Sequence, residues 1–415
     1  MVTDKSKKPE LRFKGFSDDW EQRKLSNVAE IVGGGTPSTL NPDYWDGDID
    51  WYAPAEIGKQ IFANGSIRKI TKDGLNHCSA KILPAYKTVL FTSRAGIGNM
   101  AILQRSAATN QGFQSLVCHD NIDPYFVFSM GDNIKIKAKH IAAGSTFAEI
   151  SGKKLGALEF MFPDADEQKA IGAYFMSLDK LITLHQRKCE NLKIIKKSML
   201  DNLFPKNGEK IPRWRFKGFN DDWEQRKLGD IADVTKLAGF EFTEHIVYSD
   251  EGSIIALRGL NVKDGQLVLD DVKYIDGSNF SKLGRSKLYE NDVLFTYVGT
   301  VGELAIVSEN ERFYLAPNVS RIRFQRGYDA QFMIQAMGSR TFYDNMIFPL
   351  IATSSQPALS MENIRKFIVS VPSDSAEQQE IGRYFLNLDN LITLHQSEVE
   401  RLKKVKQFFL DKMFI

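Results

Sequence analysis

The chain of 415 residues is long enough for two or three domains, each with its own core. Hydrophobic residues make up 43% and charged residues 26%, a globular composition that excludes wholesale disorder. There are 54 Lys and Arg against 52 Asp and Glu, so the net charge is only +2. Any nucleic-acid surface must therefore be built from local patches.

The sequence predicts a protein of a reducing compartment. The cysteines Cys78, Cys118 and Cys189 are odd in number and widely spaced, which argues against a disulfide framework. The N-terminal residues lead into no apolar segment of the signal-peptide kind, and no apolar run is long enough to span a membrane. We therefore expect a soluble cytoplasmic chain.

The first predicted element is a segment that is repeated later in the chain. Its sequence from Pro9 to Leu25 returns almost unchanged from Pro212 to Leu228. The segment carries no motif with a chemical function. We expect it to pack against another repeated part of the chain; docking of a partner protein is the alternative.

Residues 26–163 are predicted to form the first large domain. The glycines Gly33–Gly35 are expected either to bind phosphate through backbone N–H groups or to make a tight turn before a strand. Further on, Val89–Thr92 followed by Gly98 predicts a strand and a glycine turn, and this pattern returns as Val293–Thr296 followed by Gly302. The second large domain is therefore expected to have the same fold with a different surface.

Catalytic and metal-binding motifs are not found. No G-x-x-x-x-G-K-[ST] loop is present, and Asn41–Tyr44 has Asp in place of the second proline of an adenine-methyltransferase loop. His77-Cys78 and Cys118-His119 lack the spacing that places two ligands on one zinc ion. We predict neither a catalytic site nor a metal site in this chain.

A long helix is predicted after Pro163. The acidic run Asp164–Glu167 suits a helix N-terminus, no proline follows until Pro205, and apolar residues recur at heptad spacing. The same pattern returns from about Ser375 to the end of the chain, so we expect two long antiparallel helices paired along one seam. The predicted seam residues are Ile171, Tyr174, Leu178, Leu181, His185, Lys188, Leu192, Ile195, Ile381, Tyr384, Leu388, Leu391, His395, Glu398, Leu402 and Val405.

The predicted seam contains polar residues at the same place in both copies. His185 and Lys188 correspond to His395 and Glu398, near the midpoints of the helices. Lys188 opposite Glu398 would fix the register of an antiparallel pair. The alternative interpretation is that these side chains face solvent.

The sequence predicts an α+β fold with two globular mixed α/β domains, separated by two long antiparallel helices that form a coiled-coil-like spacer with an internal pseudo-twofold repeat. The expected parts are an N-terminal segment 1–25, a first domain 26–163, a central helix 164–205, a linker with the repeated segment 206–228, a second domain 229–372 and a C-terminal helix 373–415.

This order of variable domain, repeated helix, variable domain and repeated helix resembles the specificity subunit of type I restriction–modification enzymes. Three local patterns are similar to those of this family: the Gly33–Thr39 segment, the strand and glycine turn ending at Gly98, and the Glu-Gln-x-x-Ile-Gly start of each helix. The resemblance implies two target-recognition domains that each read half of a bipartite DNA site, and a chain without catalysis of its own.

The resemblance also implies partners and cofactors. Two methyltransferase subunits would carry S-adenosylmethionine, and restriction subunits would use ATP with Mg, while this chain itself would bind double-stranded DNA and no cofactor. The rival hypotheses are a two-domain protein-binding scaffold and a stand-alone DNA-modifying enzyme.

Candidate base- and phosphate-contacting residues follow from side-chain chemistry, because Arg and Lys suit guanine and phosphate while Asn and Gln suit adenine. In the first domain the candidates are Lys59, Gln60, Arg94, Asn110, Gln111, Ser145, Thr146, Lys153 and Lys154. In the second domain they are Lys236, Arg258, Tyr297, Asn318, Arg321, Arg323, Ser354, Ser355 and Gln356. Since the two sets differ, we expect an asymmetric DNA site.

Overall fold

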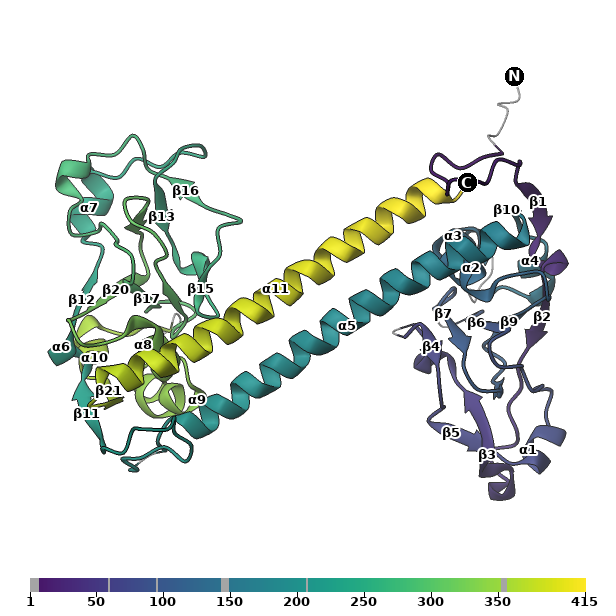
Figure 1. The fold of residues 1–415 in the computed structure, drawn as a ribbon, viewed down its shortest axis with the longest axis horizontal. Helices are drawn as coiled ribbons and strands as arrows, with labels where there is room; N and C mark the ends of the chain where they lie inside the picture. Colours follow the sequence, from purple (N-terminus) through teal and green to yellow (C-terminus); the bar gives the residue numbers. More distant parts are fainter. Residues whose placement is uncertain (1–6, 59, 95, 143–148, 207, 352–356) are drawn as a thin grey trace. The chain divides into compact units, whose positions relative to one another are not determined.

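The computed structural model describes residues 7–58, 60–94, 96–142, 149–206, 208–351 and 357–415 (Figure 1). The chain forms two compact units: residues 1–186 with 397–415 make unit 1, and residues 187–396 make unit 2. The fold is mixed α and β, and two long helices, α5 (Ala165–Leu203) and α11 (Ser375–Met413), each contribute residues to both units. Within the described ranges, no helix is both long enough and apolar enough to cross a membrane.

Unit 1 is built on two sheets with short helices around them. One sheet has the order β2 (Ala29–Gly33), β9 (Gln114–Cys118), β6 (Thr88–Phe91), β7 (Met100–Leu103) and β4 (Phe62–Ala63). The other has the order β5 (Arg68–Ile70), β3 (Trp45–Tyr52) and β8 (Ala107–Thr109). A separate antiparallel pair joins β1 (Glu21–Lys24) to β10 (Glu159–Phe162). The helices are α1 (Lys72–Asn76), α2 (Pro124–Ser129), α3 (Gly131–Ala142) and α4 (Gly152–Gly156), with 3-10 turns at Leu25–Asn27, Pro42–Tyr44 and Pro54–Glu56.

Unit 2 has a closely similar set of elements. Its first sheet has the order β12 (Ala232–Lys236), β20 (Val319–Phe324), β17 (Val293–Thr296) and β18 (Leu304–Ile306), and its second has the order β16 (Lys273–Tyr274), β13 (Ile255–Leu257) and β19 (Phe313–Leu315). The two remaining pairs are β14 (Val262–Lys263) with β15 (Gln266–Leu267), and β11 (Trp223–Lys227) with β21 (Ile368–Pro372). The helices are α6 (Leu228–Ile231), α7 (Gly239–Glu244), α8 (Ala330–Met337), α9 (Arg340–Phe342) and α10 (Met361–Arg365), with 3-10 turns at Gly259–Asn261, Phe280–Lys282 and Phe348–Leu350 and a π-turn at Tyr343–Ile347.

The two units share one topology although their sequences have diverged. The order β2-β9-β6-β7 of unit 1 corresponds to β12-β20-β17-β18 of unit 2. In the second sheets, β3 is antiparallel to β5 and parallel to β8, and β13 is likewise antiparallel to β16 and parallel to β19. The predicted α+β fold with an internal repeat is confirmed at this level.

The helix seam follows a heptad pattern whose phase differs from the predicted one. The buried positions on the two helices are spaced alternately by four and three residues. They include Ile171, Phe175, Leu178, Ile182, Cys189, Leu203, Ile381, Phe385, Leu388, Ile392, Val399, Leu402 and Met413.

Half of the predicted seam positions coincide with this pattern. Of these, Ile171, Leu178, Ile381, Leu388 and Leu402 are buried, and His185, Leu192 and His395 are half-buried.

The other half of the predicted seam lies one residue away from the buried pattern. The assignments of Leu181, Lys188, Ile195 and Leu391 to the seam are wrong, because their side chains are exposed. The half-buried Tyr174, Tyr384, Glu398 and Val405 lie on the flank of the seam. The physical reason is that a heptad pattern can place seam residues in steps of three and then four residues, or of four and then three. Apolar residues stand next to each other at several of these positions, so the sequence fits both patterns.

Glu398 is engaged within its own helix. Its carboxylate accepts hydrogen bonds from Arg401 Nε at 2.8 Å and Nη2 at 2.6 Å. Arg401 and, more weakly, the nearby His185 hold the pKa of Glu398 below its usual value. An intrahelical partner for Glu398 and an exposed Lys188 argue against the predicted register lock between these two residues.

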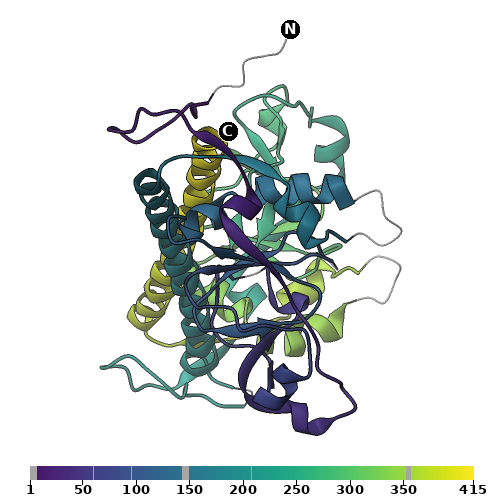
Figure 2. The same ribbon diagram turned by 90° about the vertical axis from the view of Figure 1, so that its right-hand side faces the viewer.

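The repeated N-terminal segment packs against the helices in both units. In unit 1, Arg12 donates from Nε and Nη2 to the two carboxylate oxygens of Glu167, each at 2.6 Å, and Leu11 N donates to Lys412 O at 2.9 Å. Figure 2 shows the N-terminal segment, in purple, beside the C-terminal end of α11. In unit 2, Arg215 makes the same pair of bonds to Glu377, each at 2.7 Å. The hydrogen bond to a buried carboxylate raises the pKa of each guanidinium. The predicted packing role of this segment is confirmed.

The Glu-Gln-x-x-Ile-Gly start of α5 fastens this helix to α2. Gln168 Nε2 donates to Pro163 O at 2.9 Å, and Gln168 Oε1 accepts from Asp123 N at 3.2 Å. Gly172 leaves room for the Asp123 carboxylate, since a Cβ there would lie 2.2 Å from Asp123 Oδ1. Unit 2 repeats these contacts at the start of α11.

In unit 2 the corresponding residues are Gln378, Gly382 and Asp329. Gln378 Nε2 donates to Pro372 O at 3.1 Å, and Gln378 Oε1 accepts from Asp329 N at 3.2 Å. A Cβ on Gly382 would lie 2.5 Å from Asp329 Oδ1. The motif is thus a device that packs one short helix against each long helix.

Candidate nucleic-acid interface

A turn after strand β6 is closed by one threonine hydroxyl. Thr92 Oγ1 donates to Gly96 O at 2.7 Å and accepts from Asn99 N at 2.9 Å, while Gly98 N donates to Thr92 O at 2.9 Å. Gly98 has a φ of +90°, a conformation that favours glycine. The turn is therefore shaped by main-chain contacts and one hydroxyl.

The same turn follows strand β17 in unit 2. The hydroxyl of Thr296 donates to Thr300 O and accepts from Glu303 N at 3.0 Å, and Gly302 N donates to Thr296 O at 3.0 Å. Gly302 has a φ of +102°. Both units thus use one backbone design at this place, which we call the threonine turn (described residues of 92–99 and 296–303).

Each threonine turn is also held from both sides. In unit 1, Ser93 N donates to Gly112 O at 2.8 Å, and Ser93 O accepts from Ile150 N at 3.0 Å. In unit 2, Tyr297 N donates to Asn318 O at 3.1 Å and Tyr297 O accepts from Leu359 N at 2.8 Å. These bonds involve only main-chain atoms, so the side chains can differ without changing the turn.

The side chains that the two turns carry are different. Positions 93 and 94 hold Ser and Arg, and the corresponding positions 297 and 298 hold Tyr and Val. Ser93 is buried, so the turn of unit 1 offers the half-buried guanidinium of Arg94, whereas the same backbone in unit 2 carries a half-buried phenol and an apolar side chain.

Three predicted residues of the first domain lie together beside its turn. Arg94 is half-buried next to Gly112, where an added Cβ would lie 3.5 Å from Arg94 Nε. Asn110 Oδ1 accepts from Gly112 N at 2.7 Å, and the exposed Gln111 accepts from the hydroxyl of Thr36. The structure therefore gathers Arg94, Asn110 and Gln111 on one side of the unit.

The glycines before this site serve close packing. A Cβ on Gly34 would lie 1.9 Å from Asn110 O, and one on Gly35 would lie 2.4 Å from Ser79 Oγ. Gly35 N donates to Thr109 O at 2.9 Å. Gly33 ends strand β2 and no turn follows at Gly34 or Gly35, so the predicted tight turn is not found, and the two glycines allow close packing of the chain.

The other described candidates of the first domain lie elsewhere on unit 1. Gln60 donates to the backbone carbonyl of Glu56, so part of its amide is used internally. Lys153 and Lys154 are exposed on α4, whose start is capped by Ser151 Oγ. These two lysines have the exposure that a phosphate contact needs.

Unit 2 has a cavity of about 630 Å³ beside its threonine turn. It is lined by Phe242, Tyr248, Arg258, Gly259, Leu260, Lys273, Thr296, Val298, Gly299, Thr300, Pro317 and Asn318. Arg258 is tied to Asp271 through Nη2, at 2.7 Å to Oδ1, and its Nε is buried with no hydrogen-bond partner in the described part of the chain. Asn318 is exposed and has a φ of +73°. Aromatic walls with a few polar groups are typical of a ligand-binding surface.

Lys236 ends β12, and Tyr297 follows β17 between Thr296 and Val298, which line the cavity. Lys236 Nζ lies 5.5 Å from the centre of the Tyr297 ring, within the range of a cation–π contact. Burial raises the pKa of the Tyr297 hydroxyl. The pair offers an exposed cation and a hydrogen-bonding phenol on the same side as Asn318.

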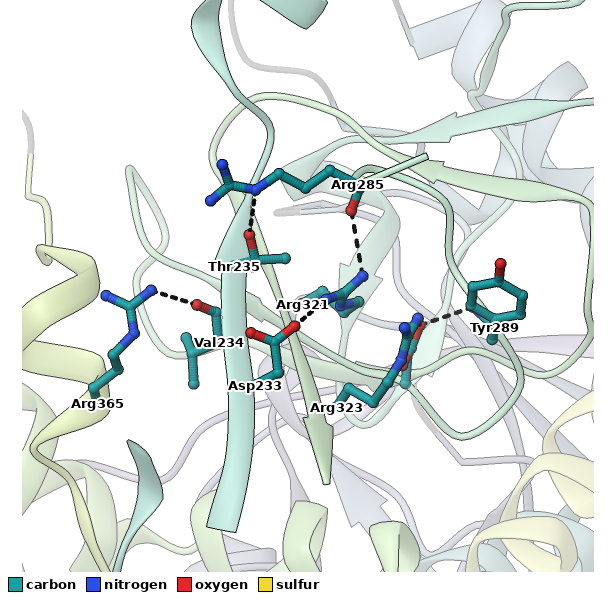
Figure 3. A network of polar contacts seen from close by, with 9 residues as sticks. Asp233, Val234, Thr235, Arg285, Tyr289, Arg321, Arg323 and Arg365 are labelled. Atoms are coloured by element: carbon teal, nitrogen blue, oxygen red, sulfur yellow. Dashed lines mark hydrogen bonds and ion pairs between the residues drawn. The ribbon is translucent and has the colours of Figure 1, made fainter. Parts of the chain in front are cut away.

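Arg321 and Arg323 belong to an internal network on strand β20 (Figure 3). Arg321 is buried, pairs with Asp233 and donates from Nη1 to Arg285 O at 3.3 Å. Arg323 donates from Nε and Nη2 to the carboxylate of Asp292, each at 2.7 Å. This ion pair raises the pKa of Arg323. These donors are used inside the unit, which favours a structural role for the buried Arg321, while the DNA contact of the partly exposed Arg323 stays a prediction.

Comparison with known proteins gives a consistent result. The sequence model of the family described as type I restriction modification DNA specificity domain matches residues 17–193 and again residues 220–404.

This chain belongs to the type I restriction–modification DNA specificity family.

Two relatives of known name are similar to this specificity protein. It is 26% identical over 414 residues to the type I restriction enzyme MjaIX specificity subunit of Methanocaldococcus jannaschii, covering 95% of this chain and 92% of the relative. It is 28% identical over 190 residues to the EcoR124I/EcoR124II specificity subunit of Escherichia coli, covering 44% of this chain and 45% of the relative.

The fold is similar to that of a solved specificity subunit. The crystal structure of a type I restriction–modification S subunit from M. genitalium matches with a TM-score of 0.65 at 14% identity, over 98% of this chain and 99% of that chain. The role of a type I specificity protein is recognition and not catalysis.

The His and Cys residues whose spacing argued against a zinc site have other contacts in this specificity protein. His77 Nδ1 lies 2.9 Å from Asp73 O, and its ring stacks on Tyr44 with centres 5.0 Å apart. Cys118 is buried in β9, and burial raises the pKa of its thiol to about 12. Within the ranges that the structure describes, no group of three or more His, Cys, Asp or Glu could hold a metal ion.

Six predicted DNA-binding residues lie outside the described residues: Lys59, Ser145, Thr146, Ser354, Ser355 and Gln356.

Two cations of unit 2 were missed by sequence reasoning. Arg285 Nε donates to Thr235 Oγ1 at 2.9 Å, and Arg365 Nη2 donates to Val234 O at 2.6 Å (Figure 3). Both arginines are exposed along strand β12, at the edge of its sheet. They are isolated in the sequence, so no motif or charge run signals them.

Proposed function

We propose that this chain is the DNA-specificity subunit of a type I restriction–modification complex, and that its two domains read the two halves of an asymmetric bipartite site. The observation that carries the proposal is the threonine turn. One backbone, closed by Thr92 or Thr296, presents different side chains in the two units. Two recognition domains that share one backbone and differ in their surface side chains are suited to two different half-sites.

Exposed cations supply the phosphate contacts in this proposal. Lys153 and Lys154 serve the first domain, and Lys236, Arg285 and Arg365 serve the second. Such contacts position a duplex without reading its sequence, and they make binding fall steeply with salt. The near-neutral net charge requires this local arrangement.

The two methyltransferase subunits dock on two matching apolar patches of the long helices. Leu181 and Leu184 in unit 1 are 44% and 48% exposed, and Leu391 and Leu394 in unit 2 are 44% and 59% exposed. Both patches lie in the same sequence, Leu-Ile-Thr-Leu-His-Gln. Identical patches bind two copies of one partner.

The catalytic chemistry resides in the partners of this proposed complex. The methyltransferase subunits supply S-adenosylmethionine, and restriction subunits use ATP with Mg. The described residues of this chain offer recognition surfaces, while α5 and α11 set the gap between the half-sites.

The test is methylation-site mapping in cells that carry the partner methyltransferase, with and without this chain. We expect one asymmetric bipartite motif whose methylation requires the chain. Exchange of residues 26–163 for the corresponding segment of another family member should change one half of the motif only. Methylation that is independent of the chain, or a change in both halves, would overturn the proposal.

A binding measurement separates this proposal from a protein-binding scaffold. The purified complex should retain a duplex with the mapped motif, and its affinity should fall steeply between 50 and 200 mM salt, roughly 10³-fold or more for six or more phosphate contacts. Binding of a protein partner with no sequence-dependent DNA retention would favour the scaffold.

The docking patches are tested by the Leu181→Asp/Leu184→Asp double variant. Its complex should hold one methyltransferase subunit in place of two, as counted by native mass spectrometry. The control is Lys180→Asp, a charge change at an exposed position beside the patch. Full stoichiometry in the double variant would contradict this docking surface.

A further inference from the structure

Arg94 differs from the other two arginines of residues 26–163 in having no polar or aromatic partner among the described residues. Arg68 stacks on Trp45, with its guanidinium carbon 3.5 Å from the ring centre. Arg105 Nε lies 3.8 Å from the carboxylate of buried Asp50. Arg94 makes no hydrogen bond, ion pair or aromatic contact with any described residue.

The base of the Arg94 side chain is nevertheless held in place. The threonine turn fixes the main chain on both sides of it through Thr92 and Ser93. Gly112 brings the neighbouring loop close, since a Cβ there would lie 2.6 Å from Pro54 Cγ and 3.5 Å from Arg94 Nε. A half-buried arginine on a rigid turn, whose donors bond to no described residue, loses little conformational freedom when it binds.

We propose that Arg94 is a specificity-determining residue that reads a guanine in the half-site of the first domain. This inference rests on the proposed function. A guanidinium donates two parallel hydrogen bonds to guanine O6 and N7, and no other base pair presents this pair of acceptors in the major groove. Asn110 and Gln111 lie beside it as further polar groups on the same surface.

The corresponding position of the second domain cannot make the same contact. Val298 has no side-chain donor, and it lines the cavity of unit 2 together with Asn318. The guanine read through Arg94 therefore belongs to one half-site only. One position of the shared turn accounts for part of the asymmetry of the whole site.

The experiment uses the full chain in complex with its methyltransferase subunits. Arg94→Ala should lower the discrimination at one G·C pair of the first half-site about 5- to 150-fold, because a bidentate pair is worth roughly that factor. The second half-site should not change. Arg94→Lys keeps the charge and one donor direction, so it should restore only part of the discrimination.

Lys153→Ala is the matched control. Removal of a phosphate-contacting lysine should weaken binding to all sequences alike and lower the slope of log affinity against log salt by about one. The melting temperature of the Arg94→Ala chain should stay close to that of the unchanged chain, since no hydrogen bond or ion pair with a described residue is lost.

The outcomes separate this inference from the proposed function. A uniform loss of affinity in Arg94→Ala would make Arg94 a phosphate contact and overturn the inference. An unchanged motif would overturn it as well. If the unchanged complex itself shows no sequence preference, the proposed function fails before Arg94 is considered.

Discussion

The carboxylate of Asp179 in α5 accepts two hydrogen bonds from Nζ of Lys406 in α11, at 2.7 and 2.9 Å. Asp179 is buried and also accepts from the Tyr125 hydroxyl at 2.8 Å. In unit 2, Lys196 Nζ makes the corresponding pair of bonds to Asp389, at 2.6 and 2.9 Å. Each lysine occupies a heptad position of the seam, so its charge is neutralised where the helices meet and specifies their register.

Removal of the lysine from the first pair should destabilise the protein. In Lys406→Met the buried Asp179 carboxylate loses its counter-ion, and we expect the free energy of unfolding to fall by about 3 kcal/mol. Urea unfolding followed by circular dichroism measures this change. The control is Lys403→Met, which removes the exposed pair with Glu400 and should cost less than about 0.5 kcal/mol. Equal costs for the two variants would refute a register role for Lys406.

Replacing the glycine near the start of either long helix by alanine should destabilise the protein, although Gly→Ala usually stabilises a helix. In an exposed helix interior, Gly→Ala stabilises by about 1 kcal/mol. Here Gly172→Ala places a Cβ 2.2 Å from Asp123 Oδ1, and Gly382→Ala places one 2.5 Å from Asp329 Oδ1. We expect each change to destabilise by about 1–3 kcal/mol in thermal unfolding. A rise in melting temperature would show that α2 and α8 do not pack this closely.

The two half-buried capping aspartates, Asp123 and Asp329, should make stability depend on pH in a defined direction. Burial raises the pKa of Asp123 and of Asp329. A raised pKa means that the folded state holds the proton more tightly than the unfolded state. This contribution therefore favours folding at low pH and is lost as the pH rises from about 4 through the raised pKa.

Asp123→Asn keeps an acceptor for Phe126 N, bonded at 2.8 Å in the unchanged chain, and removes the charge of the half-buried carboxylate. Its stability at pH 7 should equal or exceed that of the unchanged chain, and its stability should change less between pH 4 and 7. Asp123→Ala removes the cap and should cost about 1 kcal/mol. Denaturant melts at several pH values test both statements, and identical pH profiles for Asp123→Asn and the unchanged chain would contradict the assignment.

Lengthening both helices should lengthen the gap in the DNA site. One heptad inserted after Gln186 and one after Gln396 would preserve the lysine–aspartate pairs of both units and add about 10 Å to each helix. At about 3.4 Å per base-pair step, the gap should grow by roughly three base pairs in methylation-site mapping. An insertion in α5 alone is the control, since it cannot keep both lysine–aspartate pairs. An unchanged gap in the double insertion would refute spacing by the helices.

Much of the fold could be predicted because the chain contains an internal repeat, so its two halves could be compared with each other. The repeated segments and the echo of Val89–Thr92 in Val293–Thr296 pointed to one fold used twice. The phase of the helix seam could not be predicted in the same way. Tyr174 stands next to Phe175 and Leu181 next to Ile182, so the apolar pattern is satisfied by either neighbour, and only the packing partner decides.

The candidate site was predictable in its chemistry but not in its contacts. Arg94 and Arg321 are equal as sequence candidates for DNA. In the structure Arg321 meets Asp233, 88 positions away, while Arg94 meets no described partner. Such long-range pairing depends on strand register, which a single sequence does not reveal. Arg12 and Glu167 carried a usable signal, because both members return in the second copy.

The threonine turns have a consequence for how such proteins diversify. Because main-chain atoms and one hydroxyl shape each turn, a substitution at position 94 or 298 leaves the bonds around Thr92 and Thr296 intact. Natural selection can then change the recognised DNA sequence without destabilising the core of the domain. Descendants of one ancestral gene would in this way acquire new targets by single codon changes, while the shared helices continue to serve the same partners.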